Sequence, residues 1–151
     1  MSKAIIAVVL TATVLFGCAT TTGVQLANSD SDSAAKQFKP PAGKANLYLA
    51  MSEGSSSAPA EIFVDGKDAG QVGPGTFLLL ALDPGGHTMS AGSNDTSART
   101  DFDLEAGRNY FYTVNVSSTF LTMKASITIV LLEPMGKLMI RQSKRAQGTA
   151  Q

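Results

Sequence analysis

The chain has 151 residues, and its 12 Lys and Arg residues balance its 12 Asp and Glu residues. This balance lacks the basic excess typical of nucleic-acid-binding proteins, so no nucleic-acid partner is expected. Tryptophan is absent and aromatic residues make up 7% of the chain, which argues against an indole-rich sugar-binding platform. The length predicts a single domain.

The first 17 residues have the order of a secretory signal peptide. Lys3 supplies a positive charge, and residues 4–17 contain no charged side chain. As a helix these residues would span about 21 Å, whereas the hydrocarbon core of a bilayer is about 30 Å thick. The segment 1–17 is therefore predicted to be a signal peptide rather than a transmembrane helix.

The only cysteine of the chain, Cys18, directly follows this segment. The sequence Leu-Phe-Gly-Cys that ends at Cys18 resembles the lipobox of bacterial lipoproteins, although Phe16 stands where a small residue is usual. The resemblance implies cleavage before Cys18 and a palmitate-type lipid anchor on its thiol and amine. Ala19, where an Asp would favour the inner membrane, implies a lipid-anchored protein of the cell outer membrane facing the periplasm. The alternative is an ordinary signal peptide followed by an unmodified cysteine.

Residues 18–44 are polar and poor in large apolar side chains, and they contain Pro40 and Pro41. This composition predicts the lipidated cysteine and a flexible tether. Some 26 flexible residues would have an r.m.s. span of roughly 25–30 Å. The sequence thus predicts a domain held away from the membrane.

From residue 45 onward the pattern is that of short strands separated by turns. Strands are expected at 45–51, 61–64, 69–72, 75–82, 87–92, 97–104, 109–116 and 122–132. Asp65-Gly66 predicts a hairpin, because both residues tolerate positive φ. The continuous apolar run 75–82 predicts a strand buried on both faces. We therefore expect an all-β fold, an antiparallel β-sandwich of about seven or eight strands, over residues 45–143.

The last predicted strand, 122–132, alternates most clearly. One face would carry five apolar residues: Met123, Ala125, Ile127, Ile129 and Leu131. Residues 134–143 fit either a short C-terminal helix opened by Pro134 or a final strand at 137–141. Residues 144–151 lack apolar periodicity and are predicted to be a disordered tail.

Several turn motifs carry a resemblance. Val64-Asp65-Gly66-Lys67, Gly75-Thr76-Phe77, Pro84-Gly85 with His87, and Ala106-Gly107 resemble a family of uncharacterised bacterial lipoprotein domains, and the first and third are similar to PEGA-type β domains. The resemblance covers about residues 41–132. It implies an envelope location and a β fold, and it implies no reaction.

Side chains that could carry chemistry are few. His87 is the only histidine, but no Gly-x-Ser-x-Gly motif accompanies it and Cys18 is assigned to the anchor, so a structural role is favoured over a catalytic one. Asp65 and Asp68 lack the ligand spacing of an EF-hand and fit a hairpin turn better than a cation loop.

Each remaining polar cluster could be either an ordinary solvent-exposed surface or a binding site. Asp101, Asp103 and Glu105 would share the solvated face of a strand, opposite Phe102 and Leu104, or could bind a cation. Residues 55–57 are serines in a predicted loop. The C-terminal basic residues could contact anionic lipopolysaccharide or peptidoglycan, but a solvated tail is favoured: Lys137, Arg141, Lys144 and Arg145.

Two functions from different classes follow. The favoured one is a non-enzymatic β-sandwich module that binds or braces another envelope protein or the cell wall, with no cofactor, no metal and no catalytic residue expected. The alternative is an envelope hydrolase or other periplasmic enzyme with an unrecognised site. Cys18 is the single predicted site residue, a lipidation site.

Overall fold

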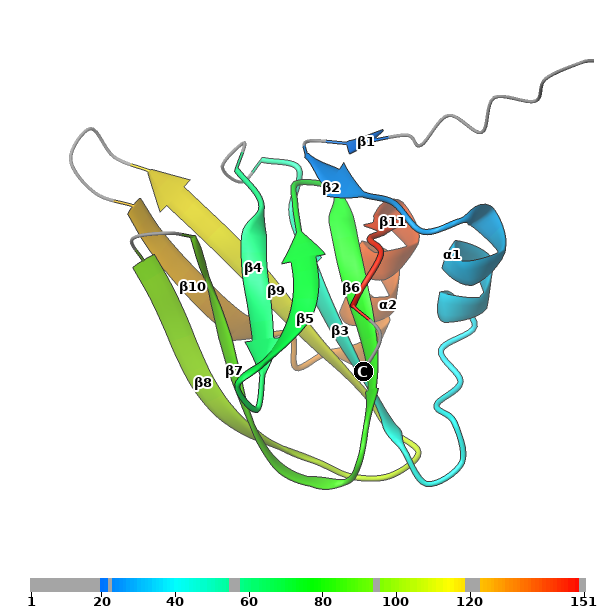
Figure 1. The fold of residues 1–151 in the computed structure, drawn as a ribbon. Helices are drawn as coiled ribbons and strands as arrows, with labels where there is room; N and C mark the ends of the chain where they lie inside the picture. The colour runs from blue at the N-terminus through cyan, green and yellow to red at the C-terminus, as the bar shows by residue number, and fades with distance from the viewer. Residues whose placement is uncertain (1–19, 22, 55–57, 94–95, 119–122, 150–151) are drawn as a thin grey trace, which may run out of the picture.

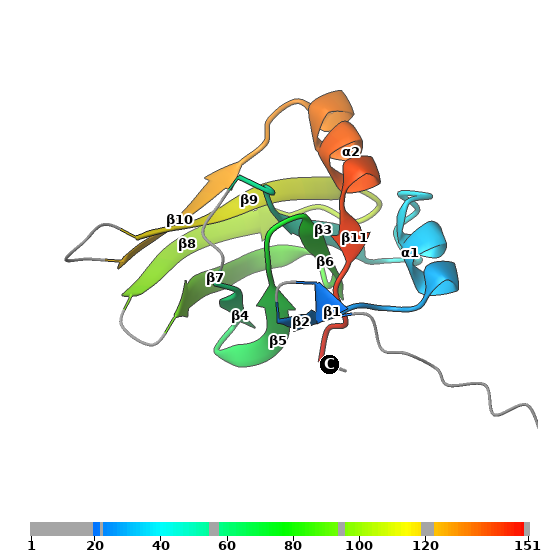
Figure 2. The same ribbon diagram turned by 90° about the horizontal axis from the view of Figure 1, so that it is seen from above.

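A computed structural model describes residues 20–21, 23–54, 58–93, 96–118 and 123–149. In this part of the chain, two sheets pack face to face, and two helices cover the outer face of one of them (Figures 1 and 2). The predicted β-sandwich is therefore confirmed. Eight longer strands form the sandwich: β3 (Ala45–Met51), β4 (Ala60–Val64), β5 (Lys67–Val72), β6 (Thr76–Leu82), β7 (Gly85–Ser93), β8 (Thr96–Leu104), β9 (Asn109–Ser118) and β10 (Met123–Ile129).

The sheet beneath the helices has the order β10-β9-β3-β6-β11, where β11 is the short strand Lys144–Arg145. Most pairs are antiparallel as predicted, but β3 runs parallel to β9 and β11 runs parallel to β6. The second sheet, β5-β4-β7-β8, is antiparallel throughout. Its β4–β5 hairpin turns at Asp65 and Gly66, whose φ angles are +52° and +76°, as the Asp-Gly pair predicts.

The main core fills the space between the sheets. β3 contributes Leu47, Leu49 and Met51 to this core, while its alternate residues Tyr48 and Ala50 face the helices. Both faces of β3 are fully buried as a result. Strand β6 is also buried along most of its length, which confirms the prediction for the apolar run 75–82. At one side of the sandwich, the outer strands β8 and β10 lie side by side (Figures 1 and 2).

The prediction of a flexible tether up to residue 44 is wrong for the residues that the structure describes. Thr20–Thr21 (β1) pairs with Val24–Gln25 (β2), and Ser29–Ala35 forms helix α1. Asn28 caps α1 by accepting a hydrogen bond from the Ser31 amide at 2.8 Å. After α1, Phe38 is buried against the rings of Tyr48 and Phe111. The burial of Phe38 and the Asn28 cap thus order a segment whose polar composition predicts disorder.

The predicted disordered tail is also ordered as far as residue 149. The Ala146 amide donates to the Phe77 carbonyl at 2.8 Å, and the Gln147 amide donates to the Gln25 carbonyl at 2.8 Å. Ala146 is buried. The tail is held by main-chain hydrogen bonds at the side of the sandwich opposite β8 and β10, which an apolar periodicity cannot reveal.

The region after β9 differs from its prediction in two ways. Strand β10 ends at Ile129, and the chain then forms helix α2 (Glu133–Gln142) with Pro134 in its first turn, so the helical alternative for this region is correct. Ala125 and Ile127 pack against the core, but Ile129 and Leu131 are 45% and 83% exposed. The predicted burial of those last two residues is wrong, because β10 stops before the chain turns away into α2.

Candidate functional site

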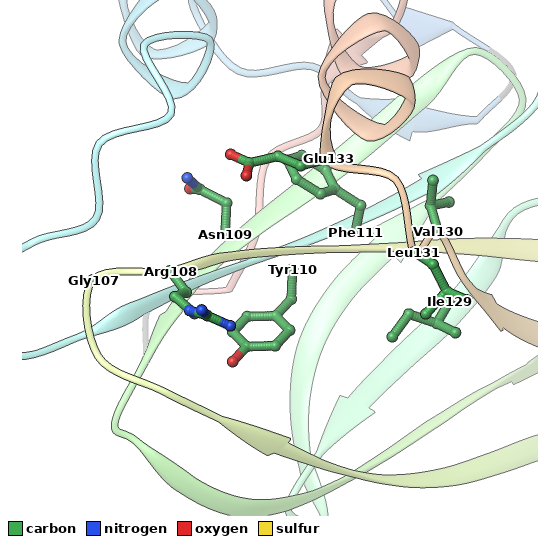
Figure 3. A pocket seen from close by; sticks show the side chains of 9 residues that line it. All are labelled: Gly107, Arg108, Asn109, Tyr110, Phe111, Ile129, Val130, Leu131 and Glu133. Carbon is green, nitrogen blue, oxygen red and sulfur yellow. The ribbon is translucent and has the colours of Figure 1, made fainter.

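A pocket of about 420 Å³ lies where β10 ends beside the beginning of β9 (Figure 3). Residues 107–111 form one wall, and residues 129–131 with Glu133 form the other. Tyr110 belongs to the core side of the sheet and Phe111 to the helix side. The pocket therefore spans the edge of strand β9 rather than one face of the sheet.

The pocket exists because β10 pairs with only part of β9. In the described residues, the ladder between them runs from Ser118 to Tyr112, and one further hydrogen bond joins the Val130 amide to the Phe111 carbonyl at 2.8 Å. The main chain of a strand points its hydrogen-bonding groups to alternate sides. The main-chain groups of Asn109 therefore point toward the line that β10 would follow if it continued.

The polar groups at the pocket have defined partners. The Arg108 side chain pairs with Glu105 (Nε–Oε2 3.2 Å), and Glu133 pairs with Lys137 (2.8 Å). The Tyr110 hydroxyl accepts a hydrogen bond from the Glu105 amide at 2.9 Å. The Arg108–Glu105 pair is largely exposed, so a ligand could replace either of its partners at little cost.

Exposed apolar side chains lie at the pocket, where Ile129 and Leu131 line it, and on the residues that follow it. In the described part of the chain, five large apolar residues are strongly exposed, and all lie between the end of β10 and the middle of α2: Ile129, Leu131, Leu132, Met135 and Leu138. Clustered exposed apolar residues mark interaction sites more often than single ones do. The pocket offers a ligand three kinds of non-covalent interaction: apolar contacts, an ion pair with the Arg108 guanidinium, and hydrogen bonds to the main chain.

His87 lies elsewhere, at the start of β7. Its Nδ1 is 2.7 Å from Asp65 Oδ2 and its Nε2 is 2.9 Å from the Asp83 carbonyl, and its ring stacks on Phe102. Partial burial acts to lower the pKa of His87, but the hydrogen bonds to Asp65 and Asp83 outweigh it, so the pKa is raised above 6.5. Both ring nitrogens are engaged, which leaves neither to act as a base toward a substrate in this arrangement.

The structure places the other predicted candidates in structural roles. Asp68 accepts a hydrogen bond from the Gly70 amide at a bulge in the hairpin, and Asp101 accepts one from the Thr88 hydroxyl. Asp101 and Asp103 lie exposed on β8 while Phe102 and Leu104 are buried, as the alternation predicts. No cluster of three or more metal-binding side chains occurs within the described ranges.

The basic residues of the C-terminal region are mostly engaged. Lys137 and Arg141 lie over the Phe38 ring at 5.5 and 5.6 Å from its centre, and Arg145 donates to the Ser31 carbonyl at 3.0 Å. Lys144 belongs to β11 and is exposed. Cys18 and the serines at 55–57 lie outside the described residues.

Sequence reasoning missed the pocket. Its signature was present in residues 129–132, Ile-Val-Leu-Leu, where the alternation of β10 changes into a continuous apolar run just before Pro134. A continuous run can mark a buried strand, and here it marks an exposed corner. Only the position of α2 separates these two outcomes.

Comparison with known proteins finds a similar protein but does not assign the chain to a family. No family model matches the chain. It is 29% identical over 102 residues to an uncharacterised protein of Haemophilus influenzae (strain ATCC 51907 / DSM 11121 / KW20 / Rd). The match covers 66% of this chain and 59% of that protein, so the chain spans less than two thirds of the relative's length. Among the described residues, no helix has the length and apolar character needed to cross a membrane.

Proposed function

We propose that the chain is a lipid-anchored envelope protein whose β-sandwich is a non-enzymatic module, and that it binds another envelope protein at the β9 edge pocket. The pocket carries the binding part of the proposal, because it combines a main-chain edge with exposed apolar side chains. The lipobox-like sequence at Cys18 supports the anchored part.

The geometry favours an extended segment of the partner as the bound element. Such a segment would continue the line of β10 and pair with the main-chain groups of Asn109, which is a short form of the strand-addition mode of peptide recognition. Ile129, Leu131 and Tyr110 would contact its side chains on the core side of the sheet. Arg108 would meet an acidic group or a main-chain carbonyl of the partner.

A site-specific cross-linking experiment tests the binding part. A photoreactive amino acid replaces Leu131 in the full chain, and a matched variant carries it in place of Lys67, which is exposed at the tip of the β4–β5 hairpin. We expect one discrete cross-linked product for position 131, lost when Ile129→Arg is added, and none for position 67. Equal products at both positions would contradict a pocket-specific partner.

Metabolic labelling tests the anchored part separately. Cells that express the wild-type chain should incorporate labelled palmitate into it, and the Cys18→Ser variant should not. The variant should also leave the membrane fraction. Continued labelling of Cys18→Ser would show that the anchor proposal is wrong, whatever the cross-linking shows.

A further inference from the structure

Three main-chain groups at the β9 edge pocket have no hydrogen-bond partner within the part of the chain that the structure describes. They are the amide and the carbonyl of Asn109 and the amide of Phe111. Because the Asn46 amide donates to the Arg108 carbonyl, the even-numbered residues of β9 bond to β3 and the odd-numbered residues point to the β10 side. Phe111 is 2% exposed, and a buried amide without a partner is rare in folded proteins.

The order of these three groups along β9 selects the direction of a bound segment. An antiparallel segment would exchange two hydrogen bonds with Asn109 and leave the Phe111 amide without a partner. A segment parallel to β9 bonds to all three groups, because each residue of a parallel pair bonds to two residues of its neighbour that are two positions apart. Strand β3 already pairs with the other edge of β9 in the parallel direction.

The same groups determine where a parallel segment ends. Its third residue from the end accepts a hydrogen bond from the Asn109 amide. Its last residue donates to the Asn109 carbonyl and accepts from the Phe111 amide. The next group along the edge, the Phe111 carbonyl, already accepts from the Val130 amide at 2.8 Å. A longer segment would therefore meet Val130 instead of a free acceptor.

We infer that the segment bound at the β9 edge pocket is the C-terminal end of another protein chain, which lies parallel to β9 with its terminal carboxylate at the Phe111 amide. The inference rests on the proposed binding function and adds the direction, the end and the chemistry of the bound segment. A charged acceptor forms a stronger hydrogen bond with an amide than a neutral carbonyl does. A carboxylate is therefore the acceptor that best satisfies this buried donor.

The beginning of α2 also favours a carboxylate at this place. Glu133, the first residue of α2, lines the pocket, and the N-cap residue Leu132 makes no side-chain cap hydrogen bond. The uncapped first amides of a helix and its dipole attract an anion. In Figure 3 the Glu133 side chain extends toward Asn109 and away from Val130. It is also paired with Lys137, so its charge is partly balanced and lies toward the beginning of the bound segment.

The side chains of the pocket specify two positions of the segment. The last residue lies across from Tyr110 on the core side of the sheet, where Ile129 and Leu131 line the pocket, so an apolar side chain fits there. The third residue from the end lies across from Arg108, whose exposed guanidinium pairs with Glu105. An acidic side chain at this position would replace Glu105 at little cost.

Selection from two peptide libraries with the purified full chain in detergent tests this inference. One library displays random peptides with a free carboxyl end, and the other displays them with both ends enclosed in a carrier protein. We expect the free-end library alone to converge, on peptides with an apolar last residue and an acidic third residue from the end. In fluorescence polarisation, amidation of the carboxyl end should weaken binding by about tenfold or more, since it removes a charged hydrogen-bond acceptor.

A charge exchange tests the third position from the end. Arg108→Glu should weaken binding of the acidic peptide and prefer a peptide with a lysine at that position. The matched control is Arg99→Glu, which changes an exposed arginine of β8 and should bind like the wild type. Circular dichroism melting checks that both variants are folded.

Three results would each overturn the inference: convergence of the enclosed library alone, convergence of neither library, or equal binding of the free acid and the amide. The cross-link from position 131 tests the proposed function separately. A discrete cross-link together with equal binding of acid and amide would therefore keep the pocket as a binding site and remove the chain end as its ligand.

Discussion

At the scale of single residues, Asp65 connects two parts of the second sheet. Its Oδ1 accepts a hydrogen bond from the Thr88 amide at 2.9 Å, and its Oδ2 contacts His87 at 2.7 Å. The bond from Thr88 and then the contact with His87 lower the pKa of Asp65 below 3.8. The tip of the β4–β5 hairpin is thereby fixed to the start of β7.

This pair should make the stability depend on pH. Because the pKa of His87 is raised above 6.5, its stabilising effect is present below pH 6.5 and is lost as pH rises through the folded-state pKa. Asp65 limits the stabilisation at the acidic end of the pH range, since its contribution to stability is lost as pH falls through its lowered pKa. The effect should stay below about 1 kcal/mol, because the pair is near the surface.

Thermal unfolding of the wild type and of His87→Gln checks this prediction. The advantage of the wild type should be greatest near pH 5–6 and should shrink toward pH 9, and Asp65→Asn should behave like His87→Gln. Parallel profiles of wild type and variants across this range would show that the pair does not contribute.

The sequence predicted part of this arrangement. Asp65-Gly66 indicates a turn because the local conformation depends on those two residues alone. The contact between Asp65 and His87 joins positions 22 residues apart, so it depends on the register between β4 and β7. No local pattern contains that information.

At the scale of elements, α2 lies very close to β9. A Cβ atom added at Gly136 would lie 2.6 Å from Cδ2 and 2.8 Å from Cβ of Phe111. Phe111 is buried and stacks on Tyr48 with ring centres 5.1 Å apart. The ring therefore has little room to move, and Gly136 sets the distance between the helix and the sheet.

We predict that Gly136→Ala destabilises the protein by about 1–3 kcal/mol, the usual cost of overpacking, although alanine favours a helix by up to about 1 kcal/mol over glycine. Urea unfolding provides the measurement. Gln142→Ala, on the exposed side of the same helix, is the control and should change little. A stabilised Gly136→Ala would mean that α2 is free to shift away from Phe111.

A second prediction concerns which side chains of strand β10 face the core. Ile127 packs partly buried against the core and Thr128 is exposed. Ile127→Asp should lower stability by about 1–3 kcal/mol, since it brings a charge to the edge of the core, whereas Thr128→Asp should change the urea midpoint little. Equal midpoints for the two variants would contradict this facing of β10.

The sequence predicted the sandwich strands well because apolar alternation follows from which face is buried. Helix α1 was missed for the same reason. Its seven residues, Ser-Asp-Ser-Asp-Ser-Ala-Ala, include one buried position, Ala35. A helix that is held by an end cap (Asn28) and by a ring beyond its end (Phe38) has no repeating pattern of apolar residues in its sequence.

At the scale of the whole molecule, the segment before β3 belongs to the domain. Phe38 lies 5.4 Å from Tyr48 and 6.1 Å from Phe111, measured between ring centres, and the Tyr48 hydroxyl donates to the Ala35 carbonyl at 2.8 Å. Shortening residues 20–40 would therefore remove part of the structure instead of only shortening a tether. If Cys18 is lipidated, five residues separate it from β2, so the reach is at most about 20 Å.

We expect Phe38→Ala to cost about 3 kcal/mol, because it removes a buried aromatic ring. Urea unfolding of the full chain measures this loss. Lys39→Ala, which changes the exposed neighbour, should be nearly neutral. An unchanged urea midpoint for Phe38→Ala would mean that the packing of Phe38 adds nothing to the free energy of unfolding. The segment before β3 would then behave as a tether although it is ordered.

The pairing of the two chain ends determines when the domain can finish folding. The Gln25 carbonyl near the start of the chain receives its hydrogen bond from Gln147, and Lys144–Arg145 completes the edge of β6. A ribosome holds the most recently added few tens of residues in its exit tunnel, so these bonds form only after residues 144–147 have emerged from it. Until then the growing chain lacks strand β11 and the hydrogen bond between Gln25 and Gln147, so the edge of the domain at β6 closes late in synthesis.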